Sequence, residues 1–281
     1  MKAITVENIQ KTFSGIPALK DVSFEIPQGE IFGFLGPSGS GKTTLIKILT
    51  AQLKVNGGTA RVLGMPAGAM QKTGQKRRFG ILTDNSGLYE RLTIEENLDV
   101  FRRLYNLPKY SIDQVLDFVN LRGERKKKVS VLSKGMRQRV TLACAIIHEP
   151  ELLFLDEPTS ALDPVNTAHI HKGLRHLNER GTTIFLTTHD MQEAEALCSR
   201  VAILHKGEIR ALGAPAELRR EHRDGMLTVE LTSGETERLP LNGHSAGVIT
   251  EWMQSGQIER LYTNEPSLGE IFIKLTGSEL V

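Results

Sequence analysis

The sequence has 281 residues, which is enough for one large domain or for a domain with a smaller one appended. It is 40% hydrophobic and 24% charged, as soluble globular proteins are, and its formal net charge of +2 gives no support for a nucleic-acid-binding protein. Its longest apolar runs fall far short of the roughly 20 residues that a membrane-spanning helix needs, and its start lacks the apolar segment of a secretion signal.

The first predicted elements are strands. Residues 3–27 alternate apolar and polar side chains in two stretches, as half-exposed antiparallel strands do. EIFGFLG (30–36) is almost continuously apolar, which predicts a strand buried on both faces. It leads into the glycine-rich stretch GPSGSGKTT (36–44), and LIKILTAQL (45–53) then continues with helical spacing.

The middle of the chain is predicted to be mostly helical. Residues 60–84 indicate short strands and turns, and two helices are expected between residues 93 and 121, the first capped by Thr93. LSKGMRQRVTLACAIIHEP (132–150) predicts a capped helix that ends before Pro150.

Strands and helices then alternate, which predicts a parallel α/β sheet. We expect a buried strand in ELLFLDEP, a helix over 164–179, a strand in TTIFLTTH, a helix in MQEAEALCSR and a strand in VAILHKGEI. Cys144 and Cys198 both stand in apolar, helix-like surroundings, so we expect buried free thiols and a reducing compartment.

The pattern changes after about residue 220. A hairpin, a helix, a strand and a last helix are expected there, and we place a domain boundary between residues 1–220 and 221–281.

The stretch GPSGSGKT matches the phosphate-loop pattern G-x-x-x-x-G-K-[ST] between a strand and a helix. Its glycines let backbone N–H groups and the helix N-terminus face a phosphate. Lys42 can reach the outer phosphates, and the Thr43 hydroxyl can hold Mg²⁺. The alternative is a glycine-rich surface turn, which the strand–helix context disfavours.

Two acids follow the apolar run LLFL. Asp156 stands at the predicted end of the strand, where a carboxylate can act on Mg²⁺, and Glu157 stands one residue further, where it can polarise a water as a general base. The alternative is that Asp156 and Glu157 are an ordinary pair of acids at a strand end. The phosphate-loop residue Lys42 upstream makes this alternative less favoured.

LSKGM (132–136) indicates a second anion site. Ser133 caps the predicted helix, and Gly135 leaves backbone N–H groups accessible to an anion. A capped helix alone is commonplace, so the inference depends on the two preceding motifs.

Five stretches carry a family resemblance, in the order GPSGSGKTT, LSKGMRQRV, LLFLDEP, SALD and TTHD. Through them, about residues 1–220 of the chain resemble the nucleotide-binding subunits of ABC transporters. The resemblance implies an α/β P-loop NTPase cassette, with a RecA-like parallel core, an antiparallel β subdomain and an α-helical subdomain at about 88–145. A small C-terminal α+β domain at 221–281 is added to it. The resemblance also implies an ATPase that uses ATP and Mg²⁺ and works as a head-to-tail dimer. Each ATP then meets Lys42 of one subunit and Ser133 and Gly135 of the other.

The resemblance implies a role for each matching residue. Glu157 and His189 would be catalytic, with His189 on the γ-phosphate, and Asp163 would lie at the dimer seam. The metal residues would be Thr43, Asp84 and Asp156. The nucleotide-binding residues would be Phe13, which stacks on adenine, together with Gly36, Pro37, Ser38, Gly39, Ser40, Gly41, Lys42, Thr43, Thr44, Ser133 and Gly135.

For three of these residues, an alternative role remains open. His189 is a structural residue if it only ends its strand, and Phe13 is strand core if its ring is buried. Asp84 stands where the family has a Gln, and it shapes a turn if Asn85 supplies the amide contact.

The stretch LSKGMRQR and the ending EPSLGEIFIKLTG look like those of ATP-binding subunits of ABC-2-type exporters, which move drugs, peptide antibiotics, lipids or ions outward. The phosphate loop differs slightly, because Ser38 and Ser40 stand where many such subunits have Asn and Ala. The resemblance implies a peripheral protein on the cytoplasmic face of the membrane, with a separate membrane permease and no nucleic-acid partner. The alternatives are a soluble ABC ATPase, which would have tandem cassettes or a coiled-coil insert, and a low-turnover regulatory module.

A GTPase is disfavoured because the chain has no N-K-x-D element. The basic run ERKKKV (124–129) is expected to be a solvated face.

Overall fold

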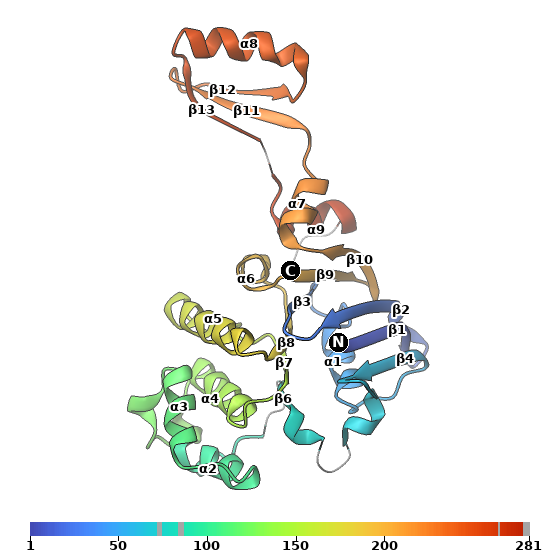
Figure 1. Cartoon of the computed structure of the whole chain (residues 1–281), viewed down its shortest axis with the longest axis vertical. Helices are drawn as coiled ribbons and strands as arrows, with labels where there is room; N and C mark the ends of the chain where they lie inside the picture. The colour runs from blue at the N-terminus through green and yellow to red at the C-terminus, as the bar shows by residue number, and fades with distance from the viewer. Residues whose placement is uncertain (72–74, 84–86, 264, 278–281) are drawn as a thin grey trace. The chain divides into compact units, whose positions relative to one another are not determined.

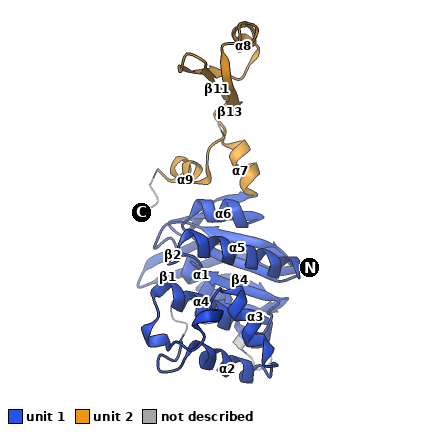
Figure 2. Cartoon of the chain, turned by 90° about the vertical axis from the view of Figure 1, so that its left-hand side faces the viewer, with its two compact units in different colours: residues 1–213, 280–281 blue, residues 214–279 orange. Residues whose placement is uncertain are grey.

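The computed structural model describes residues 1–71, 75–83, 87–263 and 265–277 (Figure 1). The chain divides into two compact units, of which the first spans Met1–Gly213 and the second begins at Ala214 (Figure 2). The helix α7 (Pro215–Glu221) therefore belongs to the second unit, which starts somewhat before the expected boundary at residue 220. Within the described ranges, no helix is both long and apolar enough to cross a membrane.

The first unit is built on a sheet of six strands in the order β10-β9-β3-β8-β7-β6. All neighbours in it are parallel except β9 and β10, and every residue of β3, β7 and β8 is buried. The α/β class and the two-faced burial of these strands are as predicted. The strands are β3 (Ile31–Leu35), β6 (Phe79–Leu82), β7 (Leu152–Asp156), β8 (Thr183–Thr188), β9 (Arg200–His205) and β10 (Glu208–Gly213).

An antiparallel sheet of four strands in the order β2-β1-β4-β5 covers part of this core. Its strand β2 brings Phe24 against Phe32 of β3, with stacked rings 5.4 Å apart between centroids. The two sheets thus share one hydrophobic core. The strands are β1 (Lys2–Phe13), β2 (Ile16–Pro27), β4 (Gly57–Val62) and β5 (Met65–Pro66).

Figure 1 shows α4, α5 and α6 along one face of the central sheet, and α1 with the antiparallel sheet along the other. The Thr93 cap is confirmed, because its side chain accepts a hydrogen bond from Glu96 N while the Glu96 carboxylate accepts one from Thr93 N. The helices are α1 (Lys42–Leu49), α2 (Ile94–Leu104), α3 (Tyr110–Phe118), α4 (Lys134–Ile146), α5 (Pro164–Glu179) and α6 (Met191–Leu197), with short 3₁₀ turns at Ala67–Gln71, Lys76–Arg78, Arg122–Glu124 and Val129–Val131.

Two predictions about element ends are wrong. The helix expected to run to residue 53 ends at Leu49, because Ala51 adopts a left-handed conformation with φ 59° that a helix cannot contain. The single strand expected in VAILHKGEI is the hairpin β9–β10, in which Lys206 (φ 49°) and Gly207 (φ 81°) both take positive φ, as the turn of a two-residue hairpin requires.

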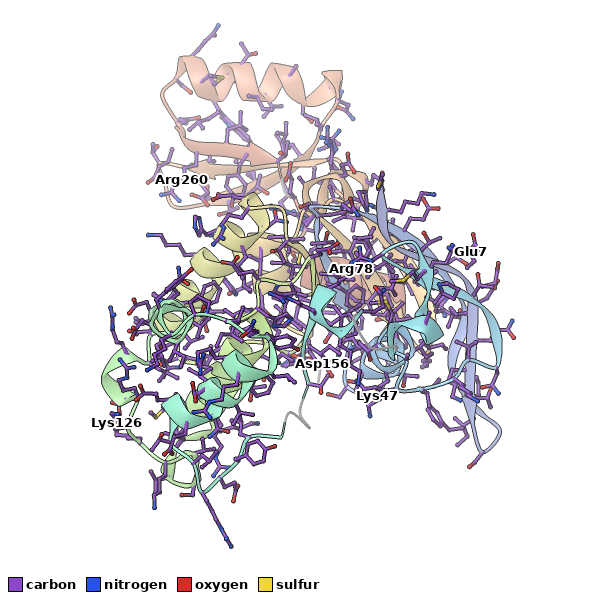
Figure 3. All side chains as sticks on the ribbon, turned by 60° about the horizontal axis from the view of Figure 1, so that its bottom comes forward. Glu7, Lys47, Arg78, Lys126, Asp156 and Arg260 are labelled. Carbon is purple, nitrogen blue, oxygen red and sulfur yellow. The ribbon has the colours of Figure 1, made fainter. Side chains whose placement is uncertain are left out.

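The basic run at residues 124–129 is only partly a solvated face. The Lys126 side chain is 82% exposed and lies at the periphery of the molecule (Figure 3). Arg125 instead joins two helices, because its guanidinium lies 2.7 Å from Glu95 of α2 and 2.9 Å from Asp113 of α3. This run therefore helps to hold the helical layer together.

Both cysteines are buried free thiols, as predicted. Burial raises the pKa of the Cys144 thiol to about 12, so it stays protonated and unreactive at neutral pH.

The second unit contains the predicted hairpin, helix, strand and last helix. Three antiparallel strands form a sheet in the order β12-β11-β13, with Val229 buried at its centre. Helix α9 begins with a capping box between Ser267 and Glu270 and buries Leu268, Ile271 and Phe272. The elements after α7 are β11 (Met226–Leu231), β12 (Thr236–Pro240), α8 (Gly243–Gln254), β13 (Ile258–Thr263) and α9 (Leu268–Thr276).

Candidate functional site

The glycine-rich loop follows β3 and ends at the first turn of α1. Gly41, at the N-terminus of α1, has φ 115°, and a Cβ there would lie 2.6 Å from the carbonyl oxygen of Ala18. Only glycine fits this position, because both the conformation and the close approach of β2 exclude a side chain. The loop can therefore turn its backbone N–H groups toward an anion at the helix N-terminus.

Lys42 lies inside this loop. Its ammonium donates to the carbonyl oxygens of Gly36 at 2.6 Å and Pro37 at 3.2 Å, and it lies 3.3 Å from the Glu157 carboxylate. The side chain is only 7% exposed, so its charge acts in a poorly solvated setting where electrostatic attraction is strong.

Asp156 ends β7 and is buried (Figure 3). Its carboxylate accepts a hydrogen bond of 2.8 Å from the Thr43 hydroxyl and another from the Thr187 hydroxyl on β8. The register of the sheet explains the second bond, because Asp156 pairs with Thr187 across β7 and β8. A hydroxyl and a carboxylate side by side are hard oxygen donors of the kind that bind Mg²⁺ together with substrate phosphates.

Glu157 stands between Lys42 and His189. One carboxylate oxygen lies 3.3 Å from the Lys42 ammonium, and the other lies 2.7 Å from Nδ1 of His189. Its φ is 51°, which is uncommon for a residue with a side chain and is typical of functional sites. The chain thus brings a cation, two acids and a histidine to the carboxyl ends of β3, β7 and β8.

A cavity of about 310 Å³ lies over the loop. Gly36 and Ser40 do not line it: Gly36 accepts the Lys42 hydrogen bond, and the Ser40 hydroxyl is buried with no hydrogen-bond partner among the described residues. The predicted residues that line the cavity are Pro37, Ser38, Gly39, Gly41, Lys42, Thr43, Thr44, Asp156 and Glu157.

Ser133 and Gly135 do not line this cavity. Ser133 caps α4 and accepts a hydrogen bond from Met136 N at 3.2 Å, as predicted. Asp163 caps α5 in the same way, through Asn166 N at 3.0 Å, and that bond holds the pKa of its carboxyl below the usual range. The N-terminus of α4 therefore does not contribute to the cavity over the phosphate loop of the same chain.

Phe13 ends β1 and is 46% exposed. The alternative that it is buried strand core is therefore wrong. The Lys11 ammonium lies 5.1 Å from the centroid of its ring, within range of a cation–π contact. The exposed Phe13 side chain is thus accessible for stacking on a ligand.

Asp84, the third metal residue suggested by the resemblance, lies outside the described residues, as does Asn85. The structure adds two residues that sequence reasoning missed. Thr187 bonds Asp156, and Gln138 of α4 donates to the Glu157 carbonyl oxygen at 2.5 Å. The two threonines before His189 could have suggested Thr187, but no local pattern in the sequence indicates Gln138.

The chain is similar to known proteins of one family. The family described as "ABC transporter" matches residues 19–160. The Nod factor export ATP-binding protein I of Rhizobium sp. (strain N33) is 38% identical over 241 residues, which are 84% of this chain and 79% of the relative. The linearmycin resistance ATP-binding protein LnrL of Bacillus subtilis (strain 168) is 36% identical over 219 residues, which are 76% of this chain and 70% of the relative.

Solved structures are similar as well. A structure described as "ATP binding subunit of ABC transporter" matches with a TM-score of 0.70 and 29% identity, covering 78% of this chain and 92% of the other. The ATP-binding cassette MJ0796, solved as a dimer in a post-hydrolysis state bound to ADP and Pi, matches with a TM-score of 0.69 and 27% identity, covering 75% of this chain and 98% of the other.

Proposed function

The chain belongs to the ABC transporter family as an ATP-hydrolysing cassette that powers a transporter, and we propose that its chemistry takes place between the phosphate loop, Asp156 and Glu157. The observation that carries this assignment is the position of Glu157, whose carboxylate contacts both the Lys42 ammonium and His189. A carboxylate held beside the charge that meets the phosphates is well placed to accept a proton from an attacking water.

Each residue has a distinct task in this proposal. Lys42 exchanges its loop carbonyls for the outer phosphates, because its ammonium gains more from phosphate oxygens than from neutral carbonyls. Thr43 and Asp156 hold Mg²⁺, which neutralises charge on the phosphates. Glu157 takes the proton of the attacking water. His189 donates a hydrogen bond to the γ-phosphate as its P–O bond breaks.

We further propose a head-to-tail dimer. The N-terminus of α4, with Ser133 and Gly135, lies apart from the cavity of its own subunit, so it is free to meet a nucleotide held by a second copy or a related subunit. The MJ0796 cassette, solved as a dimer bound to ADP and Pi, supports a dimer by analogy. Asp163 would then lie near the seam.

The transporter is proposed to be an exporter with a separate membrane permease, on whose cytoplasmic face this subunit acts. The name of one relative, a Nod factor export ATP-binding protein, supports export, and another relative is named a linearmycin resistance ATP-binding protein. The cargo is contacted by the permease, so those names do not identify the cargo of this chain.

Three measurements test this function. Phosphate release by the purified chain should require both ATP and Mg²⁺ and should stop in EDTA. In the Glu157→Gln background, ATP should trap a dimer visible by light scattering at concentrations well above micromolar, and Ser133→Arg should prevent it by placing bulk and charge at the seam. A trapped state that remains monomeric would contradict the dimer. Equal Mg²⁺ dependence of ATP binding in wild type and Asp84→Gln would exclude Asp84 from the metal site.

The second unit is proposed to be an accessory domain. Every residue assigned to the nucleotide lies in the first unit, so a chain ending at residue 213 should bind ATP as tightly as the full chain. Isothermal titration of the two proteins tests this, and loss of binding in a folded, soluble truncated chain would show that the units depend on each other.

A further inference from the structure

The side chain of Gln138 bridges residues Glu157 and Ala161 of the loop that follows β7. Its Nε2 donates to the carbonyl oxygen of Glu157 at 2.5 Å, and its Oε1 accepts a hydrogen bond from the backbone N–H of Ala161 at 3.2 Å. One amide therefore clamps the start and the end of residues 157–161. Glutamine suits this task because its amide both donates and accepts.

Gly135 makes a second contact with the same loop. A Cβ on Gly135 would lie 2.5 Å from the carbonyl oxygen of Ala161 and 3.3 Å from Cδ2 of Leu162. Helix α4 can approach the loop this closely only because residue 135 is a glycine. Residues three apart on a helix lie on the same face, so Gly135 and Gln138 act on the loop together.

The clamp acts on Glu157 where its backbone is strained. With φ 51°, Glu157 is held from both sides: its N–H donates to the carbonyl oxygen of Thr187 at 3.0 Å, and its own carbonyl oxygen accepts from Gln138 and from Ser160 N at 3.3 Å. A sparsely populated conformation persists only where surrounding contacts hold it. The direction of the Glu157 carboxylate toward His189 therefore depends on these backbone hydrogen bonds.

We propose that Gln138 is a positioning residue that couples the N-terminus of α4 to the general base Glu157 within one subunit. This rests on the proposed function, in which Ser133 and Gly135 meet the nucleotide held by the second subunit while Glu157 acts on the subunit's own nucleotide. A shift of α4 on binding that distant nucleotide moves Gln138 and Gly135, and with them the 157–161 loop. Gln138 thereby links the two ATP sites through the interior of one chain.

The test compares Gln138→Leu with Gln114→Leu, a matched change at an exposed position of α3. Phosphate release is measured against ATP concentration for wild type, both variants and Glu157→Gln. Gln138→Leu should lower kcat by about 10–100-fold, because small misplacements of a catalytic group have effects of this size, while KM stays within about twofold. The Hill coefficient for ATP should fall toward one. Gln114→Leu should match wild type.

A second variant covers the case in which Gln138→Leu does not fold. Gln138→Glu keeps the acceptor for Ala161 N and loses the donor to Glu157, so it should lower kcat with an unfolding temperature close to that of wild type. The proposal is overturned if a folded Gln138 variant keeps the kcat and Hill coefficient of wild type, or if kcat and ATP affinity fall together. Turnover retained by Glu157→Gln would instead refute the proposed function, so the two failures are distinguishable.

Discussion

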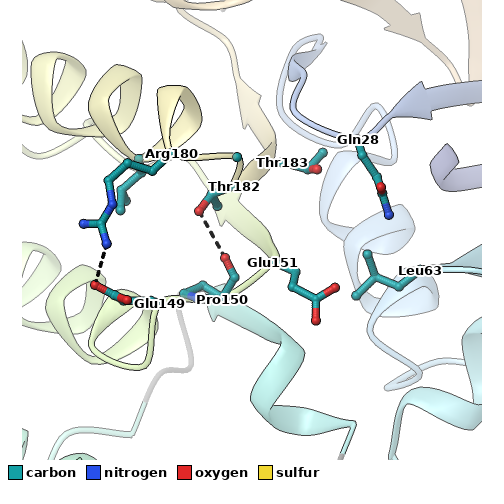
Figure 4. Close-up of a pocket in the computed structure, with 10 residues that line it drawn as sticks. Gln28, Leu63, Glu149, Pro150, Glu151, Arg180, Thr182 and Thr183 are labelled. Carbon is teal, nitrogen blue, oxygen red and sulfur yellow. Dashed lines mark hydrogen bonds and ion pairs between the residues drawn. The ribbon is translucent and has the colours of Figure 1, made fainter. Parts of the chain in front are cut away.

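One cavity at the amino end of the central sheet and the phosphate-loop cavity at its carboxyl end are similar in volume, but their charges are paired differently. At the amino ends of the strands, a cavity of about 290 Å³ is lined by Gln28, Leu63, Leu177 and residues 149–151 and 180–183 (Figure 4). At the carboxyl ends, the cavity over the phosphate loop measures about 310 Å³. The volumes of these two cavities therefore do not distinguish the cavity over the phosphate loop from the one at the opposite end.

The difference lies in how charges are paired. At the amino end Arg180 and Glu149 form an ion pair of 2.9 Å, and Thr182 donates to the Pro150 carbonyl oxygen at 3.1 Å (Figure 4). The side chains of this pair are 53% and 63% exposed, so water screens them and their attraction contributes little. At the carboxyl end Lys42 and Glu157 are 7% and 24% exposed. Their interaction is poorly screened, so a phosphate that replaced Glu157 beside Lys42 would be bound strongly.

Asp156→Asn should strongly reduce ATP hydrolysis, through a change confined to the carboxyl end. The amide removes the charge that is proposed to hold Mg²⁺, so kcat for ATP hydrolysis should fall by about 10²–10³-fold, the scale of several kcal/mol of charge stabilisation. Phosphate release at saturating ATP over a range of Mg²⁺ concentrations measures this. Wild-type turnover and Mg²⁺ dependence in the variant would exclude Asp156 from the metal site.

His148→Gln should change stability rather than activity. His148 is buried beside the amino end of β6, stacks on Tyr105 with ring centroids 4.1 Å apart and contacts the Phe79 carbonyl oxygen at 3.2 Å. Burial lowers the pKa of His148 from its ordinary 6.5 to about 4. The unfolded chain therefore takes up the proton first, and the contribution of neutral His148 to stability, present above pH 6.5, is lost as the pH falls toward 4.

This loss amounts to at most about 3 kcal/mol, from the size of the pKa shift. Glutamine does not titrate and keeps a donor for Phe79, so His148→Gln should lose less stability between pH 7 and pH 4.5. Urea unfolding of both proteins at the two pH values measures the difference. An identical pH dependence in both would contradict the burial argument, while ATP affinity at pH 7 should be equal in both.

Lys42→Ala should weaken ATP binding by about 10–100-fold, the value of a hydrogen bond to a charged group. Arg180→Gln supplies the control, because it removes an arginine from the other end of the same sheet. Isothermal titration with ATP should give the wild-type Kd for Arg180→Gln. A comparable loss of affinity in both variants would mean that the two ends do not differ as described.

The fold and the charged residues of the site were largely predictable from the sequence, whereas their contacts were not. Apolar runs predict β3 and β7, and Lys42, Asp156 and Glu157 follow those runs directly. The pairing of Asp156 with Thr187 depends on strand register, which local patterns do not determine. The end of α1 and the β9–β10 hairpin were mispredicted because single residues with positive φ, Ala51 and Lys206, are not recognisable as turn residues by type.

Gln138 was missed for a different reason. Its bonds reach residues 19 and 23 positions away along the chain, and helical spacing does not reveal which loop a polar side chain faces. The same holds for Arg125, which the composition of its segment assigned to a solvated face although it pairs with Glu95 and Asp113.

The contrast between the two ends of the sheet is tested most directly by placing the same substitution at each end. Phosphate release at saturating Mg²⁺ and ATP is measured side by side for wild type, Glu157→Gln and Glu149→Gln. Glu157→Gln should bind ATP but turn it over about 100-fold or more slowly, because it lacks the general base, while Glu149→Gln should keep the wild-type rate. Turnover by Glu157→Gln within about twofold of wild type would contradict that role of Glu157.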